Sequence, residues 1–407
     1  MRGPADSNGA RDRAAAVPDP ATPLTVAYLV GELEGAGTTV QALTACRGMA
    51  ERGLDVELVV VRRQGVLAGE VPAGLRIEEL APRDPSSGQR GVSSRDVLAA
   101  VPLLARYLRR RRPAVLWSGA KAVNLAALAA SRLSRASTRV VLTITNDLYH
   151  RASAQERGRK LSMFMIRRFY PLADKVITLS QAMTDDLVTK EGMPAELFEI
   201  IPPPIDIDRM DRLGREPVEH PWLQPGQPPV VLNVGRLAEQ KGHSILLEAF
   251  AEASRSRELR LIILGEGSQE ALGELDRRAA ALGIAAKVDI VGFDPNPYRY
   301  MTRAALFVLS SLWEGFGIVL AESMACGCPV VSSDCPYGPD EILQHGRVGR
   351  LVPISDATAL AEAILTQIDE PTDAAVLGKR ASDYGLDSLM GRYDAVLDCL
   401  RGDRGNE

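Results

Sequence analysis

The sequence predicts an α/β protein of two domains, each built around a doubly wound parallel β-sheet. Three observations carry this prediction. The chain has 407 residues, more than a single hydrophobic core usually holds. Apolar runs of strand length alternate with helical patterns in both halves of the chain. A stretch rich in proline and charge, residues 202–229, separates the halves and is typical of a linker leading into a second domain.

The first domain opens with an almost unbroken apolar run at 24–30, of the kind buried on both faces of a sheet. A glycine-rich turn at 31–37, a helical pattern at 38–52 and a second apolar run at 56–61 follow. This unit predicts two parallel strands joined by a right-handed crossover. The same rhythm predicts strands at 115–117, 140–144, 176–179 and 200–201, and helices at 97–111, 122–134, 157–171 and 181–191.

The second domain repeats the rhythm from residue 230 onward. Its predicted strands lie at 230–234, 259–264, 288–291, 306–309, 330–332 and 349–352, and its helices at 244–255, 269–282 and 356–368. We place the two domains at 24–203 and 204–385, and expect a last helix at 386–402 to complete the first one. Residues 1–23 lack an apolar signal core, so we expect a disordered N-terminal tail.

Composition and cysteine usage argue against several classes of protein. The chain is 46% hydrophobic and 25% charged, and no apolar run approaches the ~18 residues of a transmembrane helix. The five cysteines form no disulfide framework, and Cys326 and Cys328 have no further ligand at zinc spacing. We therefore expect no metal site and a cytoplasmic location. The net charge of −4 disfavours nucleic acid as a partner.

The charge is distributed unevenly along the chain. Residues 95–175 carry 17 Lys and Arg against 4 Asp and Glu, whereas residues 176–407 carry 21 against 36. The predicted helix at 157–171 mixes cations with bulky apolar residues, which favours contact with an anionic lipid surface. An ordinary amphipathic helix with its apolar side in the core has the same pattern. We predict that the basic region 105–175 contacts the inner face of the cell membrane.

The segment 310–331 holds the densest group of candidate site residues. The strand at 306–309 leads into a loop with Gly315 and Gly317, and a helix is expected to begin near residue 318. A helix start after a glycine loop presents free N–H groups to a phosphate. Glu314 lies in this loop, and Glu322 lies among apolar neighbours, where a charge needs a polar partner. We predict a ligand site; two solvated charges near a helix start are the alternative.

A second candidate cluster follows the strand at 230–234. Arg236 and Lys241 lie in a strand-to-helix loop, at the sheet edge where open parallel sheets bind ligands. Two such cations can hold a diphosphate, arginine through its fork and lysine as a point charge. A cationic surface loop is the alternative. The glycine-rich turn at 31–37 lacks the spacing of the dinucleotide fingerprint, so NAD binding is not expected.

Together these motifs resemble glycosyltransferase family 4, a large retaining family with the GT-B fold. In that fold, two Rossmann-like domains face each other with their parallel sheets across a central cleft. The resemblance covers about residues 24–400. The matching pieces are the Gly35 and Gly37 loop, Val-Ile-Thr-Leu-Ser at 176–180, Ile-Ile-Pro-Pro-Pro at 200–204, Val-Gly-Arg-Leu-Ala-Glu-Gln-Lys-Gly at 234–242, Leu-Gly-Glu-Gly at 264–267, Glu314 with Glu322, and Cys-Gly-Cys-Pro-Val-Val at 326–331.

The resemblance implies a role for each matching residue. Arg236 and Lys241 would bind the donor diphosphate, and Glu322 the ribose hydroxyls. Glu314 would hold the sugar, which makes it a catalytic residue with Arg236 and Lys241. The other implied donor-binding residues are Gly37, which approaches the phosphates from the first domain, Gly265, Phe293 near the base, and the loop residues Gly315, Phe316, Gly317 and Ile318. The family typically needs no metal or other cofactor.

One departure concerns the first domain. Family members often place a histidine after the strand that corresponds to 140–144, whereas this chain offers Asn146 and His150 as candidates for the sugar or acceptor contact. Asn146 can replace a hydrogen bond but cannot carry a proton in the same way. His150 would serve from a shifted position, or is simply a surface histidine.

The function that the resemblance implies is retaining transfer of a hexose or N-acetylhexosamine from a nucleotide sugar. A UDP-sugar is favoured by frequency within the family, and the acceptor would be a saccharide or a polyprenyl-linked saccharide in glycan or polysaccharide biosynthesis. Two alternatives stay open. One is a sugar-nucleotide epimerase or phosphorylase of the same fold, and the other is a non-catalytic member that binds a nucleotide sugar.

Overall fold

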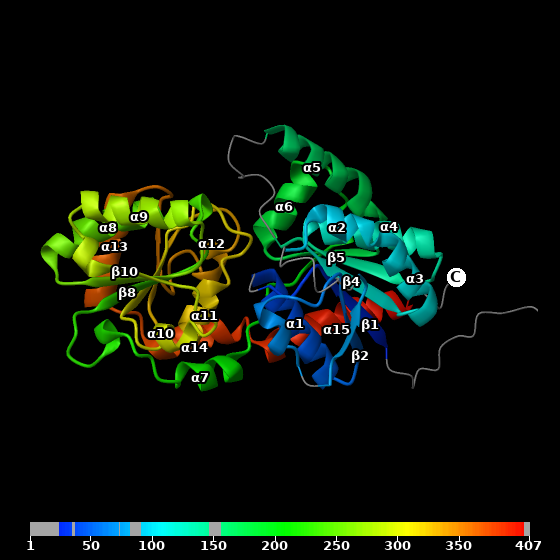
Figure 1. Cartoon of the computed structure of the whole chain (residues 1–407), viewed down its shortest axis with the longest axis horizontal. Coiled ribbons are helices and arrows are strands. Elements are labelled where there is room, and N and C mark those ends of the chain that lie inside the picture. The colour runs from blue at the N-terminus through cyan, green and yellow to red at the C-terminus, as the bar shows by residue number, and fades with distance from the viewer. Residues whose placement is uncertain (1–23, 35–36, 73, 82–90, 146–155, 403–407) are drawn as a thin grey trace, which may run out of the picture.

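The computed structural model describes residues 24–34, 37–72, 74–81, 91–145 and 156–402. Two parallel β-sheets, each with helices on both faces, form two lobes (Figure 1). The predicted fold class is confirmed. The boundary between residues 203 and 204 stays a proposal.

The first lobe is built on a sheet that, within the described residues, has seven parallel strands in the order β3-β2-β1-β4-β5-β6-β7. The order reverses between β1 and β4, the point at which open α/β sheets bind ligands. The strands are β1 Thr25–Val30, β2 Asp55–Val60, β3 Arg76–Glu79, β4 Val115–Gly119, β5 Arg139–Thr143, β6 Lys175–Thr178 and β7 Phe198–Ile200.

Helices cover both faces of this sheet (Figure 1). One face carries α1 (Gly37–Glu51) and α15 (Leu386–Gly402), and the other carries α2 (Ser94–Ala99), α3 (Val101–Arg111), α4 (Lys121–Ser134), α5 (Glu156–Phe169) and α6 (Gln181–Thr189). The single helix expected at 97–111 is wrong, because α2 ends and α3 begins at Ala100. Pro102 explains the break, since proline has no N–H to donate to the preceding turn.

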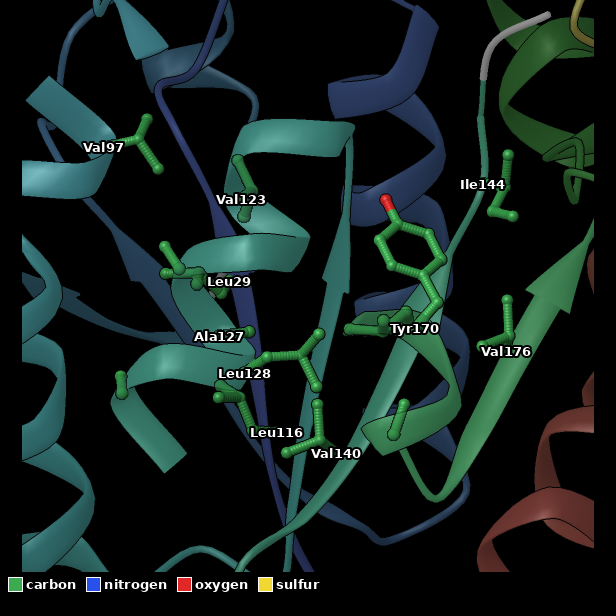
Figure 2. Close-up of a cluster of buried hydrophobic side chains, with 14 of the residues drawn as sticks. Leu29, Val97, Leu116, Val123, Ala127, Leu128, Val140, Ile144, Tyr170 and Val176 are labelled. Atoms are coloured by element: carbon green, nitrogen blue, oxygen red, sulfur yellow. The ribbon is translucent and has the colours of Figure 1, made fainter. Parts of the chain in front are cut away.

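The core on the α4 side of the sheet is apolar and close-packed (Figure 2). Leu116 and Val140 of the strands lie near Leu128 of α4. A buried asparagine within it is paired: the Asn124 amide donates to the Thr143 carbonyl at 3.0 Å and to the Tyr170 hydroxyl at 3.1 Å. These bonds fix the end of β5, which leads toward the edge where ligands are expected.

The second sheet has, among the described residues, six parallel strands in the order β10-β9-β8-β11-β12-β13. The strands are β8 Val230–Val234, β9 Arg260–Leu264, β10 Val288–Gly292, β11 Leu306–Leu309, β12 Val330–Ser333 and β13 Arg350–Val352. One face carries α8 (His243–Ser256), α9 (Gln269–Ala281) and α13 (Ala357–Asp369). The other carries α7 (Ile207–Gly214), α10 (Tyr298–Met301), α11 (Val319–Ala325), α12 (Pro339–Ile342) and α14 (Ala374–Ser382).

The expected linker at 202–229 is more ordered than the sequence suggests. Helix α7 lies inside it, where little periodicity was expected. The Asp206 side chain caps this helix by accepting from the Arg209 N–H at 3.0 Å, and Met210 is buried against the second core. One cap and one anchor residue therefore order a helix that is too short to show a helical period.

The last helix, α15, crosses back to the first lobe and packs on α1. A Cβ atom at Gly48 would lie 2.5 Å from Met390 Sδ and 2.7 Å from the Leu386 side chain, so the two helices meet closely where α1 has no side chain. This packing supports the proposal that the helix completes the first domain. No helix among the described residues is long and apolar enough to cross a membrane.

Candidate active site

The candidate site forms where the three adjacent strands β9, β8 and β11 end. The loops that follow these strands are held together by direct contacts. The Leu237 N–H donates to the Glu266 carbonyl at 2.7 Å, and the Leu312 N–H donates to the Gln240 carbonyl at 2.8 Å. The segments expected to bind the donor, 235–242, 265–267 and 310–318, therefore form one layer on the sheet.

Glycines let these loops approach each other without side chains between them. A Cβ atom at Gly265 would lie 1.8 Å from the Gly235 carbonyl oxygen. Gly242 adopts φ of +61°, and its Cβ would lie 2.1 Å from the Ser310 carbonyl oxygen. Both positions require glycine, because the obstructing atoms belong to backbone that cannot move aside. Gly265 thus has a packing role, in addition to the ligand role expected for it.

Lys241 and Glu314 form an ion pair at the centre of this layer. Lys241 Nζ lies 2.7 Å from Glu314 Oε1, and the two side chains are only 15% and 8% exposed. The Ser311 hydroxyl donates to the same carboxylate oxygen at 2.6 Å. The structure thus brings together two residues that the sequence had assigned to separate clusters.

Arg236 lies in the same loop as Lys241 and is exposed; its neighbour Gly235 packs on the lysine, since a Cβ atom there would lie 3.0 Å from Lys241 Cε. Its guanidinium makes no hydrogen bond or ion pair with the part of the chain that the structure describes. A free guanidinium in the same loop as a buried lysine suits an anion that arrives from solvent, because arginine offers a fork of donors and lysine a point charge.

A buried polar network supports the loop from below. The Asn233 amide donates to the Val308 carbonyl at 2.8 Å, which leaves its Oδ1 facing His243 Nε2 at 3.1 Å. His243 Nε2 must therefore carry a proton and donate it. Burial, with the nearby charge of Lys241, lowers the pKa of His243 to about 4. The imidazole is neutral at physiological pH and ties α8 to β8.

Glu322, on α11, is half-buried and has a partner that the sequence analysis missed. The Tyr298 hydroxyl of α10 lies 3.2 Å from Glu322 Oε1. Burial raises the pKa of the Glu322 carboxyl, while the Tyr298 hydrogen bond and the charge of Arg209 act in the opposite direction. Tyr298 lies in a helix of four residues, which is too short to show a helical period in the sequence.

The buried aromatic side chain of Phe316 fixes the loop 315–318. Phe316 is buried with its ring edge-on to Tyr384 at 5.6 Å, which leaves its backbone as the part available to a ligand. A Cβ atom at Gly338 would lie 1.7 Å from the Phe316 carbonyl oxygen. Gly317 has φ of +80°, which favours glycine. Gly315 and Ile318 are half-buried on either side of this turn.

The remaining predicted residues lie around the edge of the site. Phe293 follows β10 and is 42% exposed, and the Gly265 N–H donates to the Gly292 carbonyl at 2.8 Å beside it. Gly37 is the first residue of α1 in the other lobe, and a Cβ there would meet nothing within 4 Å. Asn146 and His150 lie outside the described residues.

The first sheet has a pocket of its own at the carboxyl ends of its strands. Its volume is about 60 Å³. The hydroxyl-bearing side chains of Thr38, Thr39, Thr143 and Thr145 line it, and the Thr145 hydroxyl is buried without a hydrogen-bond partner. The sequence analysis missed these threonines because hydroxyl residues at strand and helix ends are common and carry no motif.

In the described part of the chain, no group of three or more His, Cys, Asp and Glu side chains is arranged to hold a metal ion. Burial raises the pKa of Cys328 to about 12 and also that of the Cys326 thiol, so both stay protonated at neutral pH.

Comparison with known proteins agrees with this architecture. Paired parallel sheets with ligand-accessible loops at their strand ends define the GT-B class of two-domain α/β proteins. The model of "Glycosyltransferase Family 4" matches residues 35–209, and that of "Glycosyl transferases group 1" matches residues 215–384. The chain belongs to the glycosyltransferases of group 1 and family 4, as the sequence motifs predicted.

Relatives with assigned activities match part of the chain. The N-acetylgalactosamine-N,N'-diacetylbacillosaminyl-diphospho-undecaprenol 4-alpha-N-acetylgalactosaminyltransferase of Campylobacter jejuni is 32% identical over 210 residues, 52% of this chain and 55% of that protein. The lipopolysaccharide core biosynthesis glycosyltransferase LpsE of Rhizobium meliloti is 32% identical over 176 residues, 43% of this chain and 49% of that protein. The chain thus spans about half the length of these relatives.

A solved structure shows the same fold over nearly the whole chain. The Anabaena protein HepE, in complex with UDP and glucose, superposes with a TM-score of 0.73. The superposition covers 92% of this chain and 100% of HepE, at 21% sequence identity. At this identity the likeness establishes the fold alone.

Proposed function

We propose that the protein transfers a sugar from a nucleotide sugar to an acceptor hydroxyl, with the donor held by the loops after β8, β9 and β11. The observation that carries this proposal is the buried Lys241–Glu314 pair, with the exposed Arg236 in the same loop as the lysine. The three charged groups lie where central strands of a parallel sheet end, which is where such sheets bind ligands. The family's motifs supply the same three residues.

The proposed reaction places a growing negative charge on the departing nucleoside diphosphate. The bond from the anomeric carbon to the phosphate oxygen breaks, and the acceptor oxygen bonds to the same carbon. Arg236 and Lys241 would stabilise the charge on the leaving phosphate. Retention follows if the acceptor attacks from the face that the phosphate leaves, with its proton passing to a phosphate oxygen.

Two carboxylates would orient the donor. Glu314 shares Oε1 between Lys241 and Ser311, which leaves Oε2 for a hydroxyl of the transferred sugar. Glu322 would accept hydrogen bonds from the ribose, with Tyr298 holding its carboxyl in place. Each role uses a carboxylate whose position is fixed before the ligand arrives, which lowers the cost of ordering the complex.

The substrates follow by analogy with the relatives. The name of the Campylobacter relative gives an undecaprenyl-diphosphate-linked acceptor, and that of the Rhizobium relative gives lipopolysaccharide core biosynthesis. We propose a saccharide or polyprenyl-linked saccharide as acceptor, and a UDP-linked hexose or N-acetylhexosamine as donor. HepE, which shares the fold, was solved with UDP, so UDP-sugars are the first donors to test. The reaction is proposed to need no metal and to take place in the cytoplasm.

The test is release of nucleoside diphosphate from UDP-, GDP- and ADP-sugars, with simple saccharides or a polyprenyl-diphosphate saccharide as acceptor. The wild type should release one nucleotide faster with an acceptor present, and NMR of the product should show a retained anomeric configuration. Glu314→Gln should lower kcat by about 100-fold, on the scale of losing one preorganised polar contact. Glu362→Gln, on the exposed face of α13, is the control and should match the wild type.

Other outcomes point to the alternatives. An inverted product would contradict the retaining mechanism. Conversion of the nucleotide sugar to an isomer without acceptor would indicate an epimerase, and turnover that requires inorganic phosphate would indicate a phosphorylase. Binding of a nucleotide sugar with no turnover under any condition would identify a non-catalytic member of the family.

A further inference from the structure

Exposed apolar side chains concentrate on one part of the surface. Among the described residues, eleven large hydrophobic side chains are strongly exposed, and six of them lie within residues 95–175. This is the segment in which Lys and Arg outnumber Asp and Glu by 17 to 4. The six are Leu98, Leu103, Leu133, Leu161, Phe164 and Leu172. Apolar and cationic groups are therefore enriched on the same stretch of chain.

Helix α5 shows this arrangement most clearly. Met163 and Ile166 are buried in the first core, so the inner side of the helix already has its apolar partners. On the outer side Leu161 and Phe164 are 62% and 60% exposed, and Arg168 follows one turn later. The interpretation of this helix as an ordinary amphipathic one therefore explains its inner side but not its outer side.

The neighbouring helices extend the same surface. Helices α2 to α5 all lie on the same face of the first sheet, the upper face in Figure 1. α4 packs against both α2 and α3. We call the exposed side of these four helices the basic face. The exposed cations in these helices and at their C-terminal ends, among the residues whose burial is described, are Arg95, Arg106, Arg109, Arg110, Arg111, Arg112, Lys121, Arg132, Arg135, Lys160, Arg167 and Arg168.

Acidic groups offset only part of this charge. Arg110 pairs with Glu78, and Arg167 lies 3.8 Å from Glu191. Within the described residues, most of the other exposed arginines of these helices form no ion pair. A protein-binding surface usually has a core depleted of charged residues, whereas on the basic face single leucines and a phenylalanine stand among arginines. That mixture matches the boundary of an anionic bilayer, where apolar side chains enter the acyl region and cations meet lipid phosphates.

We propose that the basic face docks on a bilayer that contains anionic lipids, with Leu161 and Phe164 of α5 as its apolar anchors. The contact also places the first lobe's pocket near the lipid. Lys121 Nζ, at the start of α4, lies 2.5 Å from Ser162 Oγ of α5, and Ala120 and Val123 on either side of that lysine line the pocket. A lipid-linked acceptor would have a short path from the bilayer to this pocket.

The experiment is flotation of the full chain with vesicles of phosphatidylcholine alone and of phosphatidylcholine mixed with phosphatidylglycerol. The wild type should float with the anionic vesicles only, and less at high salt. Leu161→Ser/Phe164→Ser should weaken this binding by about tenfold or more through lost apolar burial. Arg168→Glu should weaken it by about tenfold through lost charge attraction.

Matched controls lie on the other lobe. Val376→Ser removes an exposed apolar side chain from α14, and Arg255→Glu reverses an exposed charge on α8. Both should float like the wild type, and all variants should keep the wild-type melting temperature because the changed side chains are exposed. No flotation of the wild type, or equal losses in the controls, would overturn the proposal.

Binding to any polyanion is the main competing outcome. If heparin competes fully and the Leu161→Ser/Phe164→Ser variant floats like the wild type, the surface is only electrostatic and the proposal fails. The vesicles contain no nucleotide sugar or saccharide, and nucleotide binding is measured without vesicles. Failure of the docking proposal and failure of the proposed function are therefore distinguishable.

Discussion

At the scale of single residues, the pair of Lys241 and Glu314 is the central feature. An ion pair this well covered gains little net stability, because desolvation of the two charges offsets their attraction. Its value lies in holding a lysine and a carboxylate in fixed positions where a ligand can meet them. A bound diphosphate would compete with Glu314 for the lysine and free the carboxylate for the sugar.

Replacing one member of this pair should lower the free energy of unfolding more than replacing both. Lys241→Met leaves the Glu314 carboxylate with Ser311 alone, and should lower the free energy of unfolding by about 3 kcal/mol. Lys241→Met/Glu314→Gln should recover most of that loss. Urea denaturation of the three proteins measures it. Surface substitutions usually change the free energy of unfolding by less than about 0.5 kcal/mol. If Lys241→Met stays within that range of the wild type, the pair is not buried in solution.

His243 should make stability depend on pH in a defined window. Its pKa is about 4 in the folded chain and about 6.5 when unfolded, so the unfolded state binds the proton more tightly. The stabilisation is full above about pH 6.5, falls as the pH drops toward 4, and totals about 3 kcal/mol. Urea midpoints across this range should show a steeper decline for the wild type than for His243→Gln. Parallel curves would contradict the assignment.

At the scale of elements, the site depends on how closely three strand-end loops pack. Glycine at 265 lets the loop after β9 touch the loop after β8, and glycine at 242 does the same between β8 and β11. The loops then position charged side chains from elements far apart in the sequence. Stability and the proposed ligand binding should therefore depend on the same backbone contacts.

Two Gly→Ala substitutions separate this packing role from helix propensity. Gly265→Ala places a methyl group against the Gly235 carbonyl oxygen, and should lower the free energy of unfolding by about 2–3 kcal/mol. Gly273→Ala, inside α9 with open space around it, should raise it by about 0.5–1 kcal/mol. Equal effects in chemical denaturation would show that the loops do not meet as described.

The elements predictable from sequence are those with a strong period or a long apolar run. The six strands of the second sheet were predicted, most of them as apolar runs followed by a turn. β3 was not, because its four residues, Arg-Ile-Glu-Glu, form a half-buried edge without an apolar run. α7, α10, α12 and α14 are short or polar, and their positions depend on caps and tertiary contacts that no local pattern records.

For the site, the sequence could identify residues but not partners. The motifs identified Lys241 and Glu314 but not their ion pair. The pair forms because β11 lies next to β8 in the sheet, although β9 and β10 separate these two strands in the chain. Tyr298 and Ser311 could not be found, because a tyrosine or serine near a strand end carries no signal until its neighbour is known. Asn146 and His150 stay predictions.

At the scale of the whole molecule, the two lobes touch through polar contacts and through Tyr337, which is buried against the core of the first lobe. The Tyr337 hydroxyl donates to Asp186 Oδ2 at 2.6 Å, and the Gln181 N–H donates to Glu341 Oε2 at 3.3 Å. Arg47 of α1 also pairs with Asp206. Tyr337 precedes Gly338, which packs on the Phe316 carbonyl, so this contact joins the first lobe to the proposed sugar-binding loop.

Loss of the Tyr337 contact should favour a more open arrangement of the lobes. Tyr337→Phe removes a hydrogen bond to a charged group, worth about 1.5–3 kcal/mol, and should increase the radius of gyration measured by X-ray scattering. Asp186→Asn should act in the same direction, and the double variant should add little to either. An unchanged radius in all three would show that the contact does not hold the lobes together.

The strand-end loops of the second sheet are proposed to bind a nucleoside diphosphate. The most direct test of this proposal is the melting temperature in the presence of UDP, GDP, ADP and their sugars, for the wild type and for Arg236→Ala and Arg255→Ala. Both arginines are exposed, so neither change should affect the free protein. We predict a concentration-dependent rise with one nucleotide class, lost in Arg236→Ala and kept in Arg255→Ala. No rise with any nucleotide, or a rise unaffected by Arg236→Ala, would contradict the proposed site.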